Sequence, residues 1–333
     1  MIMIVNIKQD ELKKTKVYDT YWKFACERQN IFMRKLRGIK YNITDDIILK
    51  EYKFTNAYRA SDRVSQYLIK NIIYQRGYTE EDIIFRILLF KTFNNIDTWK
   101  KLENKFENIN YKSFDINKYG KALNDCYNKG ERLYSGAYIM ASGKTIFGQE
   151  RKFMNHLMLI DYMLKDNITK KIIQCRKLEE LYYILLSYPT IGTFLAYQYA
   201  IDINYSELVN FNEMEFVIAG PGAKAGIRKC FSNSEEYSQE YIIKYMCEHQ
   251  KEEFKRLGLE FKNLWGRELQ LIDCQNIFCE TDKYSRVKYP DITDRNGRKR
   301  IKQKYKMKEE KIEYFYPPKW GINDKIGRNY GSK

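Results

Sequence analysis

The sequence predicts a mostly α-helical fold, and three observations support that prediction. Apolar residues recur at spacings of three, four and seven through much of the chain, as on one face of an α-helix. The 333 residues contain five prolines and 17 glycines, few enough for long helices joined by short loops. Strand and helix patterns do not alternate, and neither an internal repeat nor a heptad array occurs. A mostly α architecture is the consequence.

The helical pattern starts near the N-terminus and recurs along the chain. The first predicted helix carries Tyr18 and Trp22 on its apolar face. Thr44-Asp45-Asp46 offers an N-cap for a following apolar run, and Thr79 with the acidic residues after it caps a further helix. The predicted helices cover residues 10–37, 54–73, 83–93, 99–106, 133–141, 153–164 and 168–187.

Two segments break this pattern. Residues 216–231 place an apolar run before the turn Gly220-Pro221-Gly222-Ala223. Residues 295–308 contain eight Lys or Arg and no acid. We expect this basic run to form a loop or hairpin that contacts phosphate, and a solvated strip without a partner is the alternative.

The charge balance points to a polyanionic partner. The chain carries 59 Lys and Arg against 43 Asp and Glu, a formal net charge of +16. Nucleic acid is the simplest partner for such a charge, and solubility alone is the alternative. The only histidines are His156 and His249. A histidine-based triad or a multi-histidine metal site is therefore not expected, and catalysis would fall to carboxylates, Lys, Tyr or Cys.

Cysteine usage and hydropathy indicate the cellular compartment and the absence of a membrane span that we expect for this chain. The seven cysteines are scattered and odd in number, which favours reduced thiols in a cytoplasm. They lack the close four-cysteine spacing of an iron–sulfur site, so we expect neither metal nor cofactor. No run of 18 uncharged apolar residues occurs, so we expect no membrane span. The N-terminus is apolar for only five residues before charges begin, unlike a signal peptide.

Residues 178–203 read as two apolar helices joined by a tight turn, a pattern typical of a helix-hairpin-helix. The turn residues Thr190, Ile191, Gly192 and Thr193 are its candidate DNA contacts. Glycine permits close approach of the backbone to a ligand, and the first amides of the second helix have no intrahelical partner. A phosphate can accept their hydrogen bonds without sequence being read. The alternative is an ordinary αα-hairpin in the core.

A carboxylate near the second helix is the candidate catalytic group. The hairpin is similar to that of DNA glycosylases, in which an Asp usually follows the second helix, and Asp202 stands at the end of that helix. A partly desolvated carboxylate would stabilise the cationic sugar formed as a base leaves. Glu213, Glu215 and Asp273 are the reserve candidates. The alternative is a core acid at a helix end.

Several blocks together resemble the alpha-glutamyl/putrescinyl thymine pyrophosphorylase-like family, also described as the helical domain of hydroxymethyluracil DNA kinases. The resemblance implies kinship with the helix-hairpin-helix DNA glycosylase superfamily and a role in hypermodified DNA. Some such proteins look like anti-phage glycosylases, and others are proposed to install modified bases. The matching blocks are residues 18–24, 53–64, 219–223, 226–231, 273–280 and 283–284.

Cations flank the turn at residues 220–226. Lys224, Arg228 and Lys229 would contact phosphate if this turn binds DNA, and the alternative is a turn that only reverses the chain. No GxxxxGK[ST] run is present, so the sequence itself gives little support to a nucleotide-kinase site.

Four polar residues are candidates for a base pocket. Gln275 and Asn276 are adjacent amides of the kind that read base edges. Arg59 and Asp62 could line the same pocket. For each of them a buried structural network is the alternative.

From these features we predict a helix-hairpin-helix DNA glycosylase-like fold with a cleft between two helical subdomains. Residues 1–290 would form the helical domain and residues 291–333 a basic C-terminal segment. The predicted function is excision of a bulky modified pyrimidine from double-stranded, phage-derived DNA, with base flipping, possible use in anti-phage defence and an abasic product. Phe194 stands where bifunctional relatives carry an imine-forming lysine, so the enzyme would be monofunctional. The alternatives are a hypermodification enzyme of the pyrophosphorylase type and a non-catalytic DNA-binding module.

Overall fold

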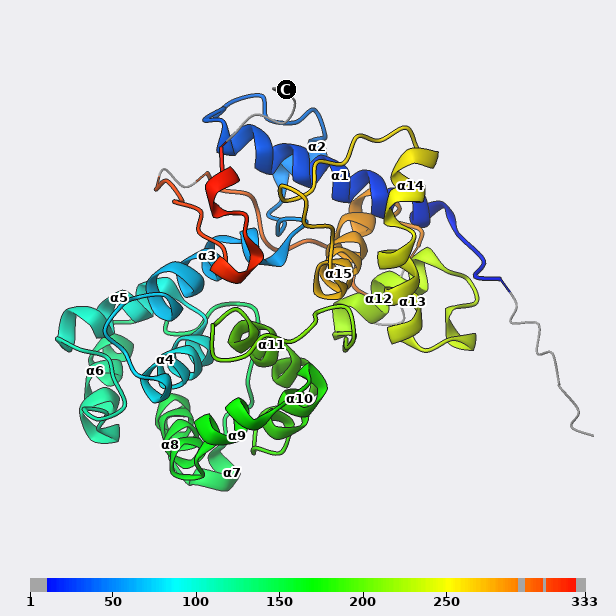
Figure 1. The fold of residues 1–333 in the computed structure, drawn as a ribbon. Coiled ribbons are helices and arrows are strands. Elements are labelled where there is room, and N and C mark those ends of the chain that lie inside the picture. Colours follow the sequence, from blue (N-terminus) through cyan, green and yellow to red (C-terminus); the bar gives the residue numbers. More distant parts are fainter. Residues whose placement is uncertain (1–10, 293–296, 308–309, 328–333) are drawn as a thin grey trace, which may run out of the picture. The chain divides into compact units, whose positions relative to one another are not determined.

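The computed structural model describes residues 11–292, 297–307 and 310–327 (Figure 1). Within these ranges the chain is mostly helical, and β-pairing is limited to isolated bridges. The predicted mostly α class is therefore confirmed. Across the same ranges no helix combines the length and the apolar character needed to cross a membrane.

The chain folds into two compact units, which we call unit 1 and unit 2. Unit 1 comprises the described residues of Met1–Ala57, Ala219–Lys262 and Asp273–Lys306. Its helices are α1 (Lys16–Leu36), α2 (Ile47–Glu51), α12 (Pro221–Cys230), the 3₁₀ turn η3 (Ser234–Glu236), α13 (Gln239–Glu248), α14 (Gln250–Arg256) and α15 (Leu271–Lys288, from Asp273 onward).

The core of unit 1 is built on the aromatic face of α1. The helix begins at Thr15, whose hydroxyl accepts a hydrogen bond from the amide of Val17. Tyr21 lies fully buried with its ring centroid 4.7 Å from that of Phe278 on α15. Its hydroxyl donates to the Cys274 carbonyl oxygen at 3.1 Å. The predicted apolar stripe of the first helix is thus the surface that joins the N-terminal helix to α15.

The glycines of the predicted phosphate turn pack helix against helix. They lie at the start of α12, where a Cβ added to Gly222 would stand 2.2 Å from the Cys279 sulfur. A Cβ at Gly226 would stand 2.0 Å from the Phe278 carbonyl oxygen. Small residues spaced four apart let α12 approach α15 closely. Packing therefore accounts for these glycines without a bound phosphate.

Unit 2 comprises the described residues of Tyr58–Ile218, Asn263–Ile272 and Met307–Lys333. Its centre is α4, in which the residues from Ile84 to Phe93 are all buried. The elements are η1 (Arg59–Ser61), α3 (Arg63–Tyr67), the π-helix η2 (Leu68–Ile73), α4 (Glu80–Phe93), α5 (Ile96–Lys105), α6 (Ile116–Asn128), α7 (Lys144–Phe147), α8 (Lys152–Lys165), α9 (Ile168–Gln174), α10 (Leu178–Leu186), α11 (Thr193–Asn204), η4 (Pro318–Trp320) and η5 (Asn323–Lys325).

Three predicted helices are wrong. Residues 168–187 form two helices, α9 and α10, because the backbone is extended at Cys175. Residues 54–73 break into η1, α3 and η2, because Tyr58 and Asp62 adopt extended backbone angles on either side of η1. Residues 133–141 form no helix; the segment is anchored by buried Leu133 and Met140 and contains Tyr138 at φ +59°. The helices α6, α7, α12, α13 and α14 were not predicted. In each case tertiary packing outweighs the local pattern.

The predicted basic segment at residues 291–333 contributes to both units. In unit 1 its backbone pairs with the end of α2, because the Lys53 amide donates to Gln303 O at 3.0 Å and the Tyr305 amide donates to Glu51 O at 2.9 Å. In unit 2 Tyr316 is fully buried. Of the predicted phosphate-contacting run, residues 295, 296 and 308 lie outside the described residues.

Candidate functional site

The predicted hairpin is present as α10, a turn and α11. The turn places Gly192 and Thr193 at the surface and buries Ile191. Thr190 adopts φ +67°, a strained backbone angle for a β-branched residue. An added Cβ on Gly192 would meet no atom within 4 Å, so the backbone of this turn is open on that side.

The N-terminus of α11 can accept an anion. Its N-cap is Gly192, which supplies no capping side chain. The first amides of a helix lack intrahelical partners, and the helix dipole favours negative charge at this end. The geometry therefore fits the predicted contact with a phosphate, which stays a prediction.

The two predicted residues Arg59 and Asp202 meet in a buried ion network, which we call the ion network of unit 2. Arg59 Nη1 lies 2.7 Å from Asp202 Oδ1, and Lys91 Nζ on α4 lies 2.6 Å from Asp202 Oδ2. Arg59 Nε also donates to Gln198 Oε1 at 2.9 Å, and Arg59 Nη1 donates to the Tyr205 hydroxyl at 3.0 Å. Two cations thus enclose one carboxylate.

Burial makes this network electrostatically strong. Asp202 is 1% exposed and Lys91 4% exposed. Burial alone would raise the pKa of Asp202, but Arg59 and Lys91 outweigh it and hold that pKa below its ordinary value. Burial lowers the pKa of Lys91 to about 8. An acid held by two cations is a stable carboxylate with both oxygens engaged, an arrangement suited to holding three helices together.

Asp62 and Glu213 lie in unit 2 but in different settings. Asp62 is half-buried and precedes α3. Glu213 is buried and pairs with Arg267 at 2.8 Å. The Arg267 guanidinium carbon in turn lies 3.7 Å from the centre of the Trp320 ring. Glu213 therefore orients an arginine against an aromatic face.

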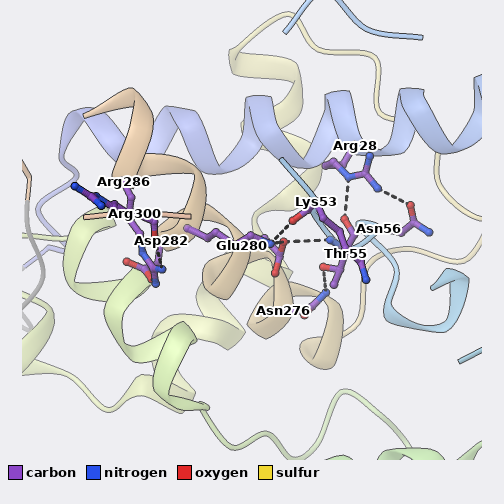
Figure 2. A network of polar contacts seen from close by, with 10 residues as sticks. Arg28, Lys53, Thr55, Asn56, Asn276, Glu280, Asp282, Arg286 and Arg300 are labelled. Atoms are coloured by element: carbon purple, nitrogen blue, oxygen red, sulfur yellow. Dashed lines mark hydrogen bonds and ion pairs between the residues drawn. The ribbon is translucent and has the colours of Figure 1, made fainter. Parts of the chain in front are cut away.

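Gln275 and Asn276 lie on α15 in unit 1. Gln275 is buried, and Asn276 donates through Nδ2 to the Thr55 hydroxyl at 3.0 Å (Figure 2). The Thr55 amide donates to Glu280 at 3.1 Å, and Arg28 of α1 donates to the Thr55 carbonyl oxygen at 2.8 Å. The amide of Asn276 thus fixes the segment before η1 to α15.

The predicted cations of α12 differ in accessibility. Lys229 is buried and lies 2.9 Å from Asp282. Asp282 also pairs with Arg286 (Figure 2). Lys224 is exposed, and Arg228 is half-buried. Asp273, a reserve acid, is 4% exposed on α15. Of these residues only Lys224 presents its charge fully to solvent.

Exposed cations follow α15 along the chain. Residues 298–300 are exposed, and Arg286 Nη1 approaches the Arg300 carbonyl oxygen at 3.5 Å (Figure 2). Lys302 and Lys306 are also exposed. We call residues 298–306 the basic strip of unit 1. Such a strip supplies phosphate contacts that are independent of sequence.

The described residues hold no group of three or more His, Cys, Asp or Glu side chains placed to bind a metal ion. The sequence analysis missed Lys91 and the tryptophans near Arg267. The signal for Lys91 was a cation, like Arg86 before it, inside the otherwise apolar run of α4.

The family model described as "5-hmdU DNA kinase, helical domain" matches residues 15–294. The chain belongs to this family. It is 25% identical over 332 residues to the 5-hmdU DNA kinase of Bacillus phage SP10, covering 94% of this chain and 52% of that protein. The chain therefore spans about half the length of this curated relative. No solved structure matches.

These findings confirm the predicted family and overturn the predicted activity. The matched family model and the relative are named for a kinase, which transfers a phosphoryl group, so the prediction of a hydrolytic, base-excising DNA glycosylase is wrong. The physical reason lies at Asp202, whose position suggested an acid facing a cationic sugar. In the structure its carboxylate is occupied by Arg59 and Lys91.

Proposed function

We propose that this chain is the DNA-recognition part of a 5-hydroxymethyluracil DNA kinase. It binds duplex DNA that carries the modified base and holds that base for phosphorylation. The observation that carries the proposal is the family match over residues 15–294, together with the activity for which the phage relative is named. Modified DNA is thus the proposed partner, and the cytoplasmic location inferred from the cysteines stays a prediction.

Phosphorylation of a hydroxymethyl group sets clear chemical needs. The hydroxyl oxygen forms a bond to the terminal phosphorus of a nucleoside triphosphate, the bond from that phosphorus to the diphosphate breaks, and the hydroxyl proton passes to a base. Catalysis of such a transfer rests mainly on positioning and on charge stabilisation. The 333 residues contain no GxxxxGK[ST] run. We therefore limit the proposal to recognition of the DNA and assign no residue of this chain to the phosphoryl donor.

Positioning of the DNA is the task that the described residues can perform. The net charge of +16 and the basic strip of unit 1 favour phosphate contacts. The uncapped N-terminus of α11 offers amides for one further phosphate. We propose that α10, the turn at residues 187–192 and α11 act as a helix-hairpin-helix grip. The expected kinship with that superfamily stays a prediction. The expected cleft between subdomains stays a prediction.

Binding of modified DNA tests the proposed function. The purified chain is titrated into labelled duplexes that differ only in one base, 5-hydroxymethyluracil or thymine, and fluorescence anisotropy gives the two dissociation constants. We expect tighter binding of the hydroxymethylated duplex. Mass spectrometry of nucleosides from the same samples should find the modified base intact.

Two outcomes would contradict this function. Equal affinity for the two duplexes would show that the chain does not recognise the modified base. Loss of the base, with abasic sites in its place, would contradict a role in phosphorylation. Replacing exposed Lys224 by Gln serves as a control for general phosphate contact, because it should weaken binding to both duplexes equally.

A further inference from the structure

A surface cavity of about 500 Å³ lies in unit 2. Its walls come from the loop before α15 and from the segment that contains η4 and η5. The volume is within the range of small-ligand sites. The lining side chains that could contact a ligand are Trp265, Arg267, Glu268, Gln270, Trp320 and Lys325.

One wall of the cavity is a stacked arginine and tryptophan. The Arg267 guanidinium lies 3.7 Å from the Trp320 ring centre and is held by Glu213 at 2.8 Å. The Trp320 ring also stacks on Tyr316, with centroids 5.9 Å apart and planes 25° apart. Aromatic rings and arginine planes are the surfaces on which unstacked bases rest. This wall therefore presents planar groups on which a base can stack.

Trp265 occupies a position where a bulky residue is unfavourable. Leu264 and Arg267 pair through two backbone hydrogen bonds of 3.2 and 3.0 Å, which close a two-residue turn. Both turn residues have positive φ, +50° for Trp265 and +104° for Gly266. Asn-Gly is the favoured pair in such turns, and a tryptophan at positive φ is strained. Strain of this kind persists where a side chain serves a ligand.

The polar groups of the cavity match a base with its phosphate. Gln270 lines it, with Nε2 donating to the Glu268 backbone carbonyl at 2.9 Å, and the Glu268 side chain lines it too. Amide and carboxylate groups contact the donors and acceptors of base edges. Lys325 is exposed at the rim and can pair with phosphate. A second cavity, of about 480 Å³, is lined by Glu80, Glu81 and Lys170 and has neither an arginine nor a tryptophan in its lining.

We infer that this cavity binds a single pyrimidine base turned out of the DNA duplex. The base stacks on the platform of Arg267 and Trp320 and against Trp265. This inference rests on the proposed function and names the residues that would recognise the modified base. Extrusion of a base from the duplex costs unstacking energy. Stacking of the extruded base on the aromatic side chains of the cavity offsets that cost.

Trp265→Asn tests the inference while keeping the turn. Asparagine tolerates positive φ and forms the favoured Asn-Gly turn, which offsets the lost contact between the Trp265 and Tyr316 rings. Circular dichroism and thermal unfolding check that the variant is folded before it is titrated. The anisotropy titrations are repeated with this variant. Because stacking on an aromatic side chain contributes about 1–3 kcal/mol per base, affinity for the hydroxymethylated duplex should fall by about 5- to 150-fold. Affinity for the thymine duplex should stay unchanged.

The matched control is Tyr41→Asn, which removes an aromatic ring that is 75% exposed in a loop of unit 1. It should preserve both affinities. If the native chain prefers the modified duplex and Trp265→Asn keeps the full preference, the cavity is not the base site. If the native chain shows no preference, the proposed function itself fails. A third titration measures ATP binding by the native chain and by Trp265→Asn. If the variant loses ATP binding but keeps its preference for the modified duplex, the cavity binds a free nucleotide, and the inference is wrong.

Discussion

Asp202→Asn tests whether one carboxylate holds the ion network of unit 2 together. Its oxygens lie 2.7 Å from Arg59 Nη1 and 2.6 Å from Lys91 Nζ, and the residue is 1% exposed. An amide carries no charge, so the variant leaves two buried cations uncompensated. Loss of one partner from a buried ion pair costs about 3–5 kcal/mol. We expect the free energy of unfolding to fall by at least about 3 kcal/mol, a large share of the stability of a typical domain.

Urea unfolding followed by tryptophan fluorescence and circular dichroism measures this loss. The matched control is Asp161→Asn, because Asp161 pairs at 2.7 Å with Lys165, whose side chain is 70% exposed. That exposed pair should contribute less than about 0.5 kcal/mol. Adding Lys91→Met to Asp202→Asn removes one of the two uncompensated cations. The double variant should therefore be more stable than Asp202→Asn alone.

A loss smaller than about 1 kcal/mol for Asp202→Asn would refute this reasoning, because it would match an ordinary substitution. The same holds if the double variant shows no recovery, since the cost would then come from the amide and not from unpaired charge. Either result would show that the charge of Asp202 is not what holds the network together.

Three further predictions follow from other parts of the chain. Replacing the cations of residues 298–300 by Gln should reduce the slope of log affinity against log salt by roughly one unit for each phosphate that is no longer bound, and an unchanged slope would exclude them from the DNA surface. Gly226→Ala should cost about 1–3 kcal/mol or more in urea unfolding, because its Cβ would stand 2.0 Å from a backbone oxygen. Gly192→Ala, whose Cβ meets nothing within 4 Å, should cost less than about 1 kcal/mol, the loss expected when alanine replaces glycine at an N-cap. Burial lowers the pKa of His156 from 6.5 to about 4. Between these two pH values His156 is protonated in the unfolded chain and neutral in the folded chain. Stability should therefore fall by up to about 3 kcal/mol as pH drops from 6.5 to 4, and His156→Gln should lose this pH dependence.

Local chemistry made part of the fold predictable. The N-caps at Asp46 and Thr79 hold as expected, because each bonds to an amide three residues ahead. The break at residues 54–73 was not predictable, because Arg59 leaves the helical pattern to reach Gln198, 139 positions along the chain. A single sequence does not reveal which distant partner a buried arginine will find.

The site residues were predictable to different degrees. Arg59 and Asp202 were each singled out, but Lys91 completes their network and only a cation within the apolar run of α4 hinted at it. The spacing of Gly222 and Gly226 fits helix packing as well as a phosphate turn, and the close approach to α15 decides between them. Trp265 and Trp320 come together only through folding, so the cavity between their loops left no local signature.

The assembly of unit 1 from distant segments bears on how the chain emerges from the ribosome. Helix α1 ends at Leu36, but its partner α15 begins only at Leu271. At about 5–20 residues per second, on the order of 10–50 s pass before the buried face of α1 can be covered. During that interval the ring of Tyr21 lacks its native partner Phe278 on α15. We therefore expect chaperones to bind the newly made α1 until α15 has been synthesised. Most of unit 2 lies in the continuous segment Tyr58–Ile218, so unit 2 can begin to fold during synthesis.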